Sequence, residues 1–170
     1  TMIFRIFFIF YLFSVVALAD NSNASELLNK ALKKNYQFIE KSLDQSELKI
    51  GTSSGKIFYD DKGMTVKVLS PFEENYRLEG EFIEIHDLFL DQKQRVTIKE
   101  INSFFLNLLT DGVDSNSENY KINYINDALI EIIPNDGSSS IKFFFKNDNL
   151  ALIRYKDSIG IEHGIELTQI

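Results

Sequence analysis

The chain has 170 residues, with 18 Lys and Arg against 25 Asp and Glu, and its formal net charge is −7. An acidic chain whose lysines are scattered rather than clustered is not expected to bind nucleic acid or to dock electrostatically on anionic lipid. The sequence contains no cysteine, which excludes disulfides, thiolate metal sites, cysteine nucleophiles and acylation of an N-terminal cysteine.

The first residues predict export. Arg5 is followed by the apolar run Ile6–Phe13, and Ala17–Ala19 forms an A-x-A site. A basic start, a short apolar stretch and small residues at the end are the parts of a secretory signal peptide. An uncleaved anchor helix is the alternative, but residues 6–19 fall short of the roughly 20 apolar residues that span a bilayer. We therefore predict a signal peptide over residues 1–19, cleavage after Ala19 and a periplasmic location.

Residues 20–170 are expected to fold as one domain, because no linker, repeat or low-complexity block divides them. The domain opens with a predicted amphipathic helix of about 17 residues, for which Ser25 is a candidate N-cap. One stripe at helical spacing consists of Leu28, Ala31, Leu32, Asn35 and Ile39, widened by Leu27 and Phe38.

After Asp44 the hydrophobic pattern changes to the two-residue period of strands. The strands predicted in the first half are Glu47–Ile50, Lys56–Asp60, Met64–Leu69, Asn75–Glu79, Phe82–His86, Leu88–Asp91 and Arg95–Lys99. A short apolar helix is then predicted over Ser103–Leu109. The closing strands are Tyr120–Asn126, Leu129–Ile133, Ile141–Lys146, Leu150–Lys156 and His163–Thr168.

This element order predicts a mainly β fold of the α+β class. An antiparallel sheet of about 11 strands twists and curls toward a barrel rather than staying flat. The first helix must bury its apolar stripe, and the concave face of the sheet is the available surface. We therefore expect a curled antiparallel sheet that forms an incomplete β-barrel covered by helices.

Polar motifs give little support for catalysis. Gly51–Gly55 matches the G-x-S-x-G pattern of a nucleophile elbow, but a strand follows where the elbow requires a helix, so we interpret it as a flexible connection. His86 and His163 have no second histidine at metal-ligand spacing and are interpreted as surface or strand-edge residues. Acid pairs such as Asp60 and Asp61 point to opposite faces of a strand. No enzyme activity, metal or cofactor is predicted.

The remaining candidate site is apolar. Alternating apolar residues on the predicted strands share one face, and the short helix is placed to plug the opening. Residues of this kind mostly form core, but a curled sheet of this size tends to enclose a cavity. The candidate lipid-binding residues are Met64, Val66, Val68, Tyr76, Leu78, Ile83, Ile85, Val96, Ile98, Phe104, Phe105, Leu108, Ile141, Phe143, Phe145 and Leu152.

Several diffuse motifs are spread over nearly the whole of residues 20–170. They are Ser54–Tyr59, Leu69–Pro71, Tyr76–Glu79, Gly80–Asp87, Leu90–Val96, Leu150–Gly160 and Gly164–Leu167. In these motifs and in its element order the chain resembles the periplasmic outer-membrane lipoprotein carriers, the LolA-like proteins. It departs from them at Asp60–Thr65, where the family usually carries Arg-Pro and an arginine that helps to latch the lid.

The resemblance implies an incomplete barrel whose apolar cavity holds the acyl chains of lipoproteins. It further implies a monomeric carrier that moves acylated lipoproteins, or a related lipid, from an inner-membrane release complex toward an outer-membrane acceptor. The missing Arg-Pro leaves a LolA-like envelope sensor or glycolipid-binding module, which does not shuttle lipoproteins, as an alternative. A small secreted hydrolase is a third hypothesis, disfavoured because no catalytic triad is recognisable.

Overall fold

The computed structural model describes residues 21–101 and 103–170, so the predicted signal peptide and its cleavage after Ala19 lie outside the described residues. Residues 21–32 are helical, and the helix buries Leu28 together with neighbouring alanines against the sheet. Asn29 ties this helix to a distant segment. Its side-chain amide donates to the Val113 carbonyl and its amide oxygen accepts from the Val113 N–H, both at 2.8 Å.

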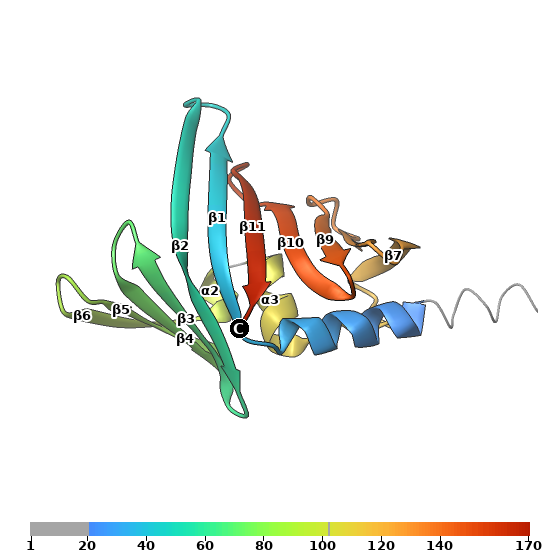
Figure 1. The fold of residues 1–170 in the computed structure, drawn as a ribbon, viewed down its shortest axis with the longest axis horizontal. Helices are drawn as coiled ribbons and strands as arrows, with labels where there is room; N and C mark the ends of the chain where they lie inside the picture. Colours follow the sequence, from blue (N-terminus) through green and yellow to red (C-terminus); the bar gives the residue numbers. More distant parts are fainter. Residues whose placement is uncertain (1–20, 102) are drawn as a thin grey trace, which may run out of the picture.

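The described residues form one antiparallel sheet of eleven strands (Figure 1). The strands are β1 (Tyr36–Asp44), β2 (Lys49–Asp60), β3 (Gly63–Ser70), β4 (Glu74–Glu79), β5 (Phe82–Asp87), β6 (Gln92–Thr97), β7 (Tyr120–Asn126), β8 (Leu129–Pro134), β9 (Ile141–Lys146), β10 (Asn149–Lys156) and β11 (Glu162–Gln169). Two short helices, α2 (Ile98–Ile101) and α3 (Phe104–Asp111), lie between β6 and β7 in the chain.

The sheet order is β6-β5-β4-β3-β2-β1-β11-β10-β9-β8-β7, so β6 and β7 are edge strands that do not pair with each other. The sheet curls, and we call its two sides the β3–β6 wing and the β7–β11 wing. The helices α2 and α3 lie between these wings (Figure 1). The expected fold class, an incomplete antiparallel barrel of 11 strands covered by helices, is therefore confirmed.

In an antiparallel sheet the turns lie alternately at the two ends of the strands. At one of these ends lie the connections at residues 45–48, 71–73, 88–91, 135–140 and 157–161, and we call this end of the sheet the mouth edge. Figure 1 shows the β1–β2 and β10–β11 turns together at the top of the molecule. The remaining hairpin turns lie on the opposite edge.

The core is divided into two clusters of buried side chains. The larger cluster joins the first helix to the β7–β11 wing and includes Leu28, Ile130 and Phe143, which are fully buried. The smaller cluster lies on the β3–β6 wing and consists of Met64, Leu78, Ile83 and Ile98. Partly buried residues of α3 pack against each cluster. The two wings of the sheet are thus packed separately.

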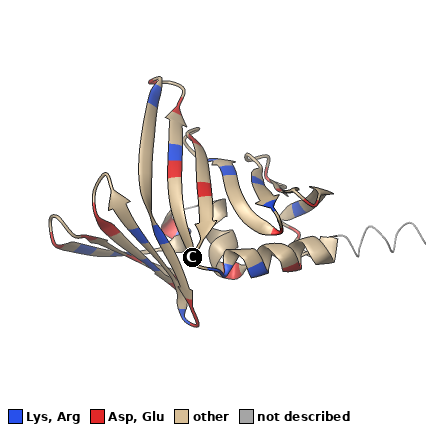
Figure 2. Cartoon of the chain, in the orientation of Figure 1, with Lys and Arg blue, Asp and Glu red and all other residues tan. Residues whose placement is uncertain are grey.

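Charged residues of both signs are spread over the sheet, as Figure 2 shows for the described chain. Several form pairs on the outer surface, of which the best connected is Arg77 on β4. Its guanidinium contacts Asp60 at 2.7 and 3.0 Å and Glu79 at 3.2 Å. The Arg77 guanidinium holds the pKa of the Asp60 carboxyl far below its usual range.

The first helix is shorter than predicted. The helical pattern was expected to continue through Ile39, but the chain turns after residue 32 and β1 begins at Tyr36. β1 pairs with both β2 and β11, and Tyr36 and Phe38 are buried while Gln37 is exposed. Hydrogen bonding on both sides outweighs the local helical spacing. Ser25 lies inside the helix, where its hydroxyl donates to the Ser22 carbonyl at 3.0 Å, and is not an N-cap.

The Gly51–Gly55 segment is part of β2 and not a flexible connection. It pairs with β1 along its whole length, and the register of β2 against β3 shifts between Ser54 and Gly55. A Cβ on Gly55 would lie 2.0 Å from the Lys67 carbonyl oxygen and 2.8 Å from the Phe38 ring. Glycine is therefore required here because two strands and a core ring approach its backbone closely.

Three other predicted strands differ from the structure. The strand expected over Glu47–Ile50 has its first two residues in the β1–β2 turn, and its last two open β2. Residues Leu88–Asp91 form the β5–β6 turn, in which the Asp87 carboxylate accepts from the Leu90 N–H at 2.9 Å and Asp91 has a positive φ. The strand expected over Arg95–Lys99 ends at Thr97, because α2 begins at Ile98. Glu100 accepts from the Thr97 N–H at 3.1 Å and satisfies a donor at that helix start.

Replacement of Gly55 by alanine should destabilise the domain by about 1–3 kcal/mol, the usual cost of overpacking. The new methyl group would overlap a backbone carbonyl, which cannot move without disturbing β3. Urea unfolding monitored by circular dichroism measures the change. Gly164→Ala is the matched control, because a Cβ there meets its nearest atoms at 4.0 Å. Equal unfolding midpoints for the two variants would contradict this account of β2.

Candidate functional site

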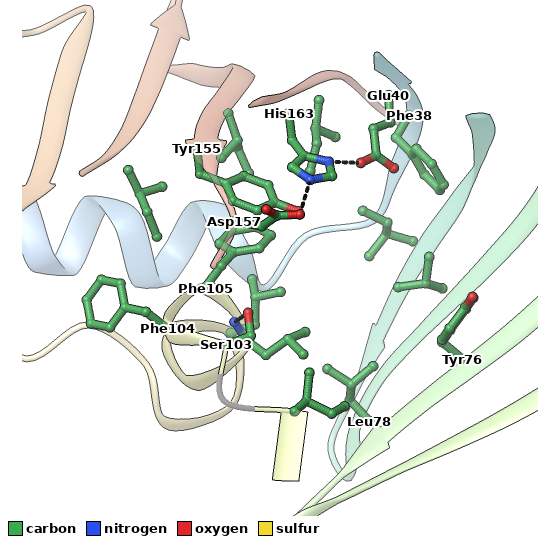
Figure 3. A pocket seen from close by; sticks show the side chains of 18 of the residues that line it. Phe38, Glu40, Tyr76, Leu78, Ser103, Phe104, Phe105, Tyr155, Asp157 and His163 are labelled. Atoms are coloured by element: carbon green, nitrogen blue, oxygen red, sulfur yellow. Dashed lines mark hydrogen bonds and ion pairs between the residues drawn. The ribbon is translucent and has the colours of Figure 1, made fainter. Parts of the chain in front are cut away.

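The concave face holds a cavity of about 1040 Å³ between the two core clusters. Its wall draws on the inner sides of β1 to β5 and β9 to β11, on α3, and on Leu32 at the end of the first helix. Figure 3 shows side chains from these elements facing a common space. The cavity exists because each wing packs its own cluster and neither cluster reaches across the sheet.

Ten of the sixteen residues predicted to bind lipid line this cavity. They are Met64, Val66, Val68, Tyr76, Leu78, Ile83, Ile85, Phe104, Phe105 and Ile141. Seven belong to β3, β4 and β5, where the two-residue period was read correctly, and all of these face inward. The α3 pair is positioned by Ser103, whose hydroxyl caps the helix by accepting from the Leu106 N–H at 3.3 Å.

The other six predicted residues do not line the cavity. Leu108, Phe143 and Phe145 fill the larger core cluster, and Ile98 and Val96 belong to or pack on the smaller one. Leu152 is outside for a different reason. The pairing of β10 with β9 shifts register between Leu150 and Leu152, so Leu150 and Ile153 face inward and Leu152 faces out beside Gly164.

Many lining residues were missed, and three of them share one cause. Because residues 36–41 were assigned to a helix, the inward side chains of β1 were not recognised. These are Tyr36, Phe38 and Glu40, all of which line the cavity. The alternation of Tyr36, Phe38 and Glu40 with exposed neighbours is typical of a strand. Burial raises the pKa of Tyr36 to about 12, and its hydroxyl donates to the Ala31 carbonyl at 2.7 Å.

A polar cluster interrupts the apolar wall beside the mouth edge. His163 on β11 bonds Glu40 on β1 through Nδ1 at 2.6 Å and Asp157 through Nε2 at 3.0 Å (Figure 3). Only 16% of its side chain is exposed. The interpretation of His163 as a simple surface or strand-edge residue is therefore wrong. The prediction failed because Glu40 and His163 are 123 residues apart and only the β1–β11 pairing joins them.

Aromatic rings cover this cluster from inside the cavity. Tyr155 stacks on His163 at a centroid distance of 4.6 Å and an interplanar angle of 8°. Phe105 of α3 stacks on the other side of the same tyrosine at 4.7 Å and 26°. The stack of Phe105, Tyr155 and His163 therefore connects the covering helix to β10 and β11.

The electrostatic environment of the cavity is negative. Burial, followed by the charges of Glu40 and Asp157, raises the pKa of Tyr155 well above its usual value. The pKa of Tyr76 is also raised, first by burial and then by Glu74, whose carboxylate accepts a hydrogen bond from the Tyr76 hydroxyl. The charge of Glu40 adds to this effect. Burial alone would raise the pKa of Asp157, but hydrogen bonds from His163 and from two backbone N–H groups lower it below its usual range.

This arrangement lacks the geometry of a hydrolase. Both ring nitrogens of His163 are bonded to carboxylates, so neither is available to take a proton from a serine. The Ser53 hydroxyl donates to Glu40 at 3.1 Å instead. Within residues 21–101 and 103–170, no group of three His, Asp or Glu side chains is arranged to hold a metal ion. None of the helices described is long and apolar enough to cross a membrane.

Comparison with known proteins finds similarity in structure but not in sequence. No protein-family model matches the chain, and no curated protein matches it. A LolA superfamily protein from Nitrosomonas europaea is similar in structure at 8% identity, over 84% of this chain and 90% of that one, with a TM-score of 0.44. A DUF1329 family protein from Desulfovibrio piger is similar at 11% identity, over 91% of each chain, with a TM-score of 0.43.

The lowered pKa of Asp157 predicts a pH-dependent contribution to stability. A carboxyl whose pKa is lower in the folded state stabilises the fold above its unfolded pKa of about 3.9 and loses that contribution as the pH falls through its folded pKa. Asp157→Asn should therefore unfold at lower urea than the parent protein at pH 5.5, and the difference should shrink as the pH falls below about 4. Asp61→Asn, in the exposed β2–β3 turn, serves as the control. A constant difference across this range would contradict the assignment.

Proposed function

We propose that the protein binds lipid acyl chains in the cavity of its concave face and acts as a carrier of lipoproteins or a related lipid. The observation that carries this proposal is the unfilled volume of about 1040 Å³ with mainly apolar walls. It lies at the upper end of the roughly 300–1000 Å³ usual for small-molecule pockets. About ten buried methylenes contribute roughly 8 kcal/mol before the costs of binding.

The mouth edge supports an opening for such a ligand. Turn residues from three of its five connections line the cavity, among them Phe72, Ser138 and Ile159. The exposed fraction of Phe72 is 73% and that of Ile159 is 79%. Turns usually carry polar residues, so apolar side chains at the entrance need a functional reason.

The neighbouring β5–β6 turn extends this apolar rim. Leu88, Phe89 and Leu90 are all exposed, and the Leu88 N–H donates to the Glu73 carbonyl of the β3–β4 connection at 3.1 Å. The exposed fraction of Phe89 is 86%. An apolar rim around an apolar cavity is suited to receiving a lipid from a membrane or a partner without exposing it to water.

Carrier action also requires that the empty protein remain stable. α3 covers the cavity and contacts the opposite wall through the stack of Phe105 on Tyr155. No arginine is among the described residues that line the cavity. In this proposal the stack of Phe105 on Tyr155 takes the place of the arginine latch of the LolA-like carriers. Refilling of the cavity by α3 would stabilise the unloaded state.

The cargo and route form the second level of the proposal. Export across the inner membrane, transfer of acylated lipoproteins from an inner-membrane release complex and delivery to an outer-membrane acceptor follow from the resemblance to LolA-like carriers. A binding or sensing module that retains its lipid is the competing function. The absence of Arg-Pro at Asp60–Thr65 favours it, whereas the exposed rim at Phe72 and Phe89 favours transfer.

Replacement of Ile85 by aspartate should weaken the binding of a fluorescent fatty-acid analogue at least tenfold, because a carboxylate would be buried against the acyl chain. Titration of the probe measures the change. Ile133→Asp introduces the same charge on the exposed outer face of β8 and should leave binding within about twofold. Equal binding by both variants, or mass spectra of gently purified protein without any lipid, would count against the proposal.

The double variant Phe89→Ser/Leu90→Ser should separate transfer from binding, because both residues are exposed on the rim and neither lines the cavity. Loss of the rim should slow vesicle-to-vesicle transfer of the analogue severalfold, because the mouth would dock less well, while equilibrium affinity stays unchanged. Ile125→Ser removes an exposed apolar residue of β7 near the opposite edge and is the matched control. Unchanged transfer in the double variant would favour the binding or sensing module.

A further inference from the structure

We propose that the ligand of this cavity carries a positively charged head group, an ammonium on an acyl or alkyl tail, and that the cluster of Glu40, His163 and Asp157 receives it. This inference rests on the proposed function, because it assigns the head of a ligand whose tail fills the apolar volume. It follows from the charges, the free acceptors and the aromatic faces that line one end of the cavity.

The charges do not balance within the cavity. Four carboxylates line it, those of Glu40, Glu74, Asp136 and Asp157. The basic groups in the described lining are His163 and Lys156, and the Lys156 amine already pairs with Glu162 at 3.4 Å. His163 meets two carboxylates with its two ring nitrogens, so even as an imidazolium it neutralises only one of them.

The excess charge is costly beside an acyl chain. Side chains of Glu40 and Asp157 are only 28% and 29% exposed, and a ligand tail in the cavity would displace the water that still solvates them. A buried charge that loses water without gaining a partner is strongly destabilising. A cationic head would compensate this loss, whereas an anionic head would add to the repulsion.

The cluster retains hydrogen-bonding capacity for such a head. Glu40 accepts one bond from His163 and one from Ser53, which leaves lone pairs on both carboxylate oxygens. Tyr155 lines the cavity, and within the described part of the chain its hydroxyl has no hydrogen-bond partner. An ammonium N–H has acceptors of both kinds within this end of the cavity.

Aromatic faces complete the environment. Phe38 and Phe105 line the same end as the carboxylates of Glu40 and Asp157, as the close view in Figure 3 shows, whereas the Tyr155 ring is already stacked between His163 and Phe105. Aromatic rings attract cations through their negative faces, and this attraction strengthens when water is excluded. Burial is the largest cause of the raised pKa of Tyr155, and the charges of Glu40 and Asp157 add to it, which agrees with a negative potential at this end.

The test compares three probes of equal chain length below their micelle concentrations: dodecylammonium, neutral dodecyl maltoside and dodecyl sulfate. Each displaces a fluorescent acyl analogue with an uncharged head from the full chain at low salt. The ammonium probe should bind at least tenfold more tightly than the sulfate. Raising the ionic strength should reduce this ratio, because the preference is electrostatic.

Glu40→Gln and Asp157→Asn should each reduce the ammonium-to-sulfate ratio to about threefold or less, because each removes one negative charge from the cluster. Glu166→Gln is the matched control, since Glu166 lies on the same strand as His163 but pairs with Lys41 on the outer face at 3.2 Å. Should one cavity variant fail to fold, the other variant and the salt dependence of the parent protein still decide the matter.

Equal affinity for the charged probes, or a ratio that none of the cavity variants alters, would overturn the inference while maltoside binding upheld the acyl cavity. Failure of all three probes to bind would overturn both this inference and the proposed function. The two failures are therefore distinguishable in one set of titrations.

Discussion

Continuous antiparallel hydrogen bonding from β6 to β7 is the constraint on which the rest of the structure depends. A sheet of this width must curl, and its concave face becomes too wide for a few short helices to fill. The first helix packs on the β7–β11 wing, and α2 with part of α3 packs on the β3–β6 wing. The cavity is the space that remains between these two packed regions.

The central strands of this sheet hold the cavity open and also bring its polar groups together. β1 and β11 are neighbours through a pairing that joins the two ends of the described chain, and this pairing places Glu40 near His163. The ring of Tyr155 then stacks on His163, and Phe105 of α3 stacks on Tyr155. The Glu40–His163 pair, the covering helix and the sheet are therefore linked through one set of contacts.

Unfilled apolar volume and partly buried carboxylates both lower stability, so their presence together needs a reason. A ligand with an apolar tail and a cationic head would fill the apolar volume and neutralise the carboxylates at once. Release at the mouth edge would restore both costs, and α3 is the element placed to limit the loss by packing into the space. Binding and release would then differ by a modest free energy, as a carrier requires.

Local patterns in the sequence determined the β-rich class, the inward faces of β3, β4 and β5, the helix near Phe104 and most hairpins, because side-chain alternation and turn residues act over a few positions. Tertiary structure decided the rest. Pairing on both sides turned residues 36–41 from helix into strand, a register shift turned Leu152 outward, and a contact spanning 123 residues made His163 part of the cavity. These outcomes depend on partners distant in the chain, which no local pattern records.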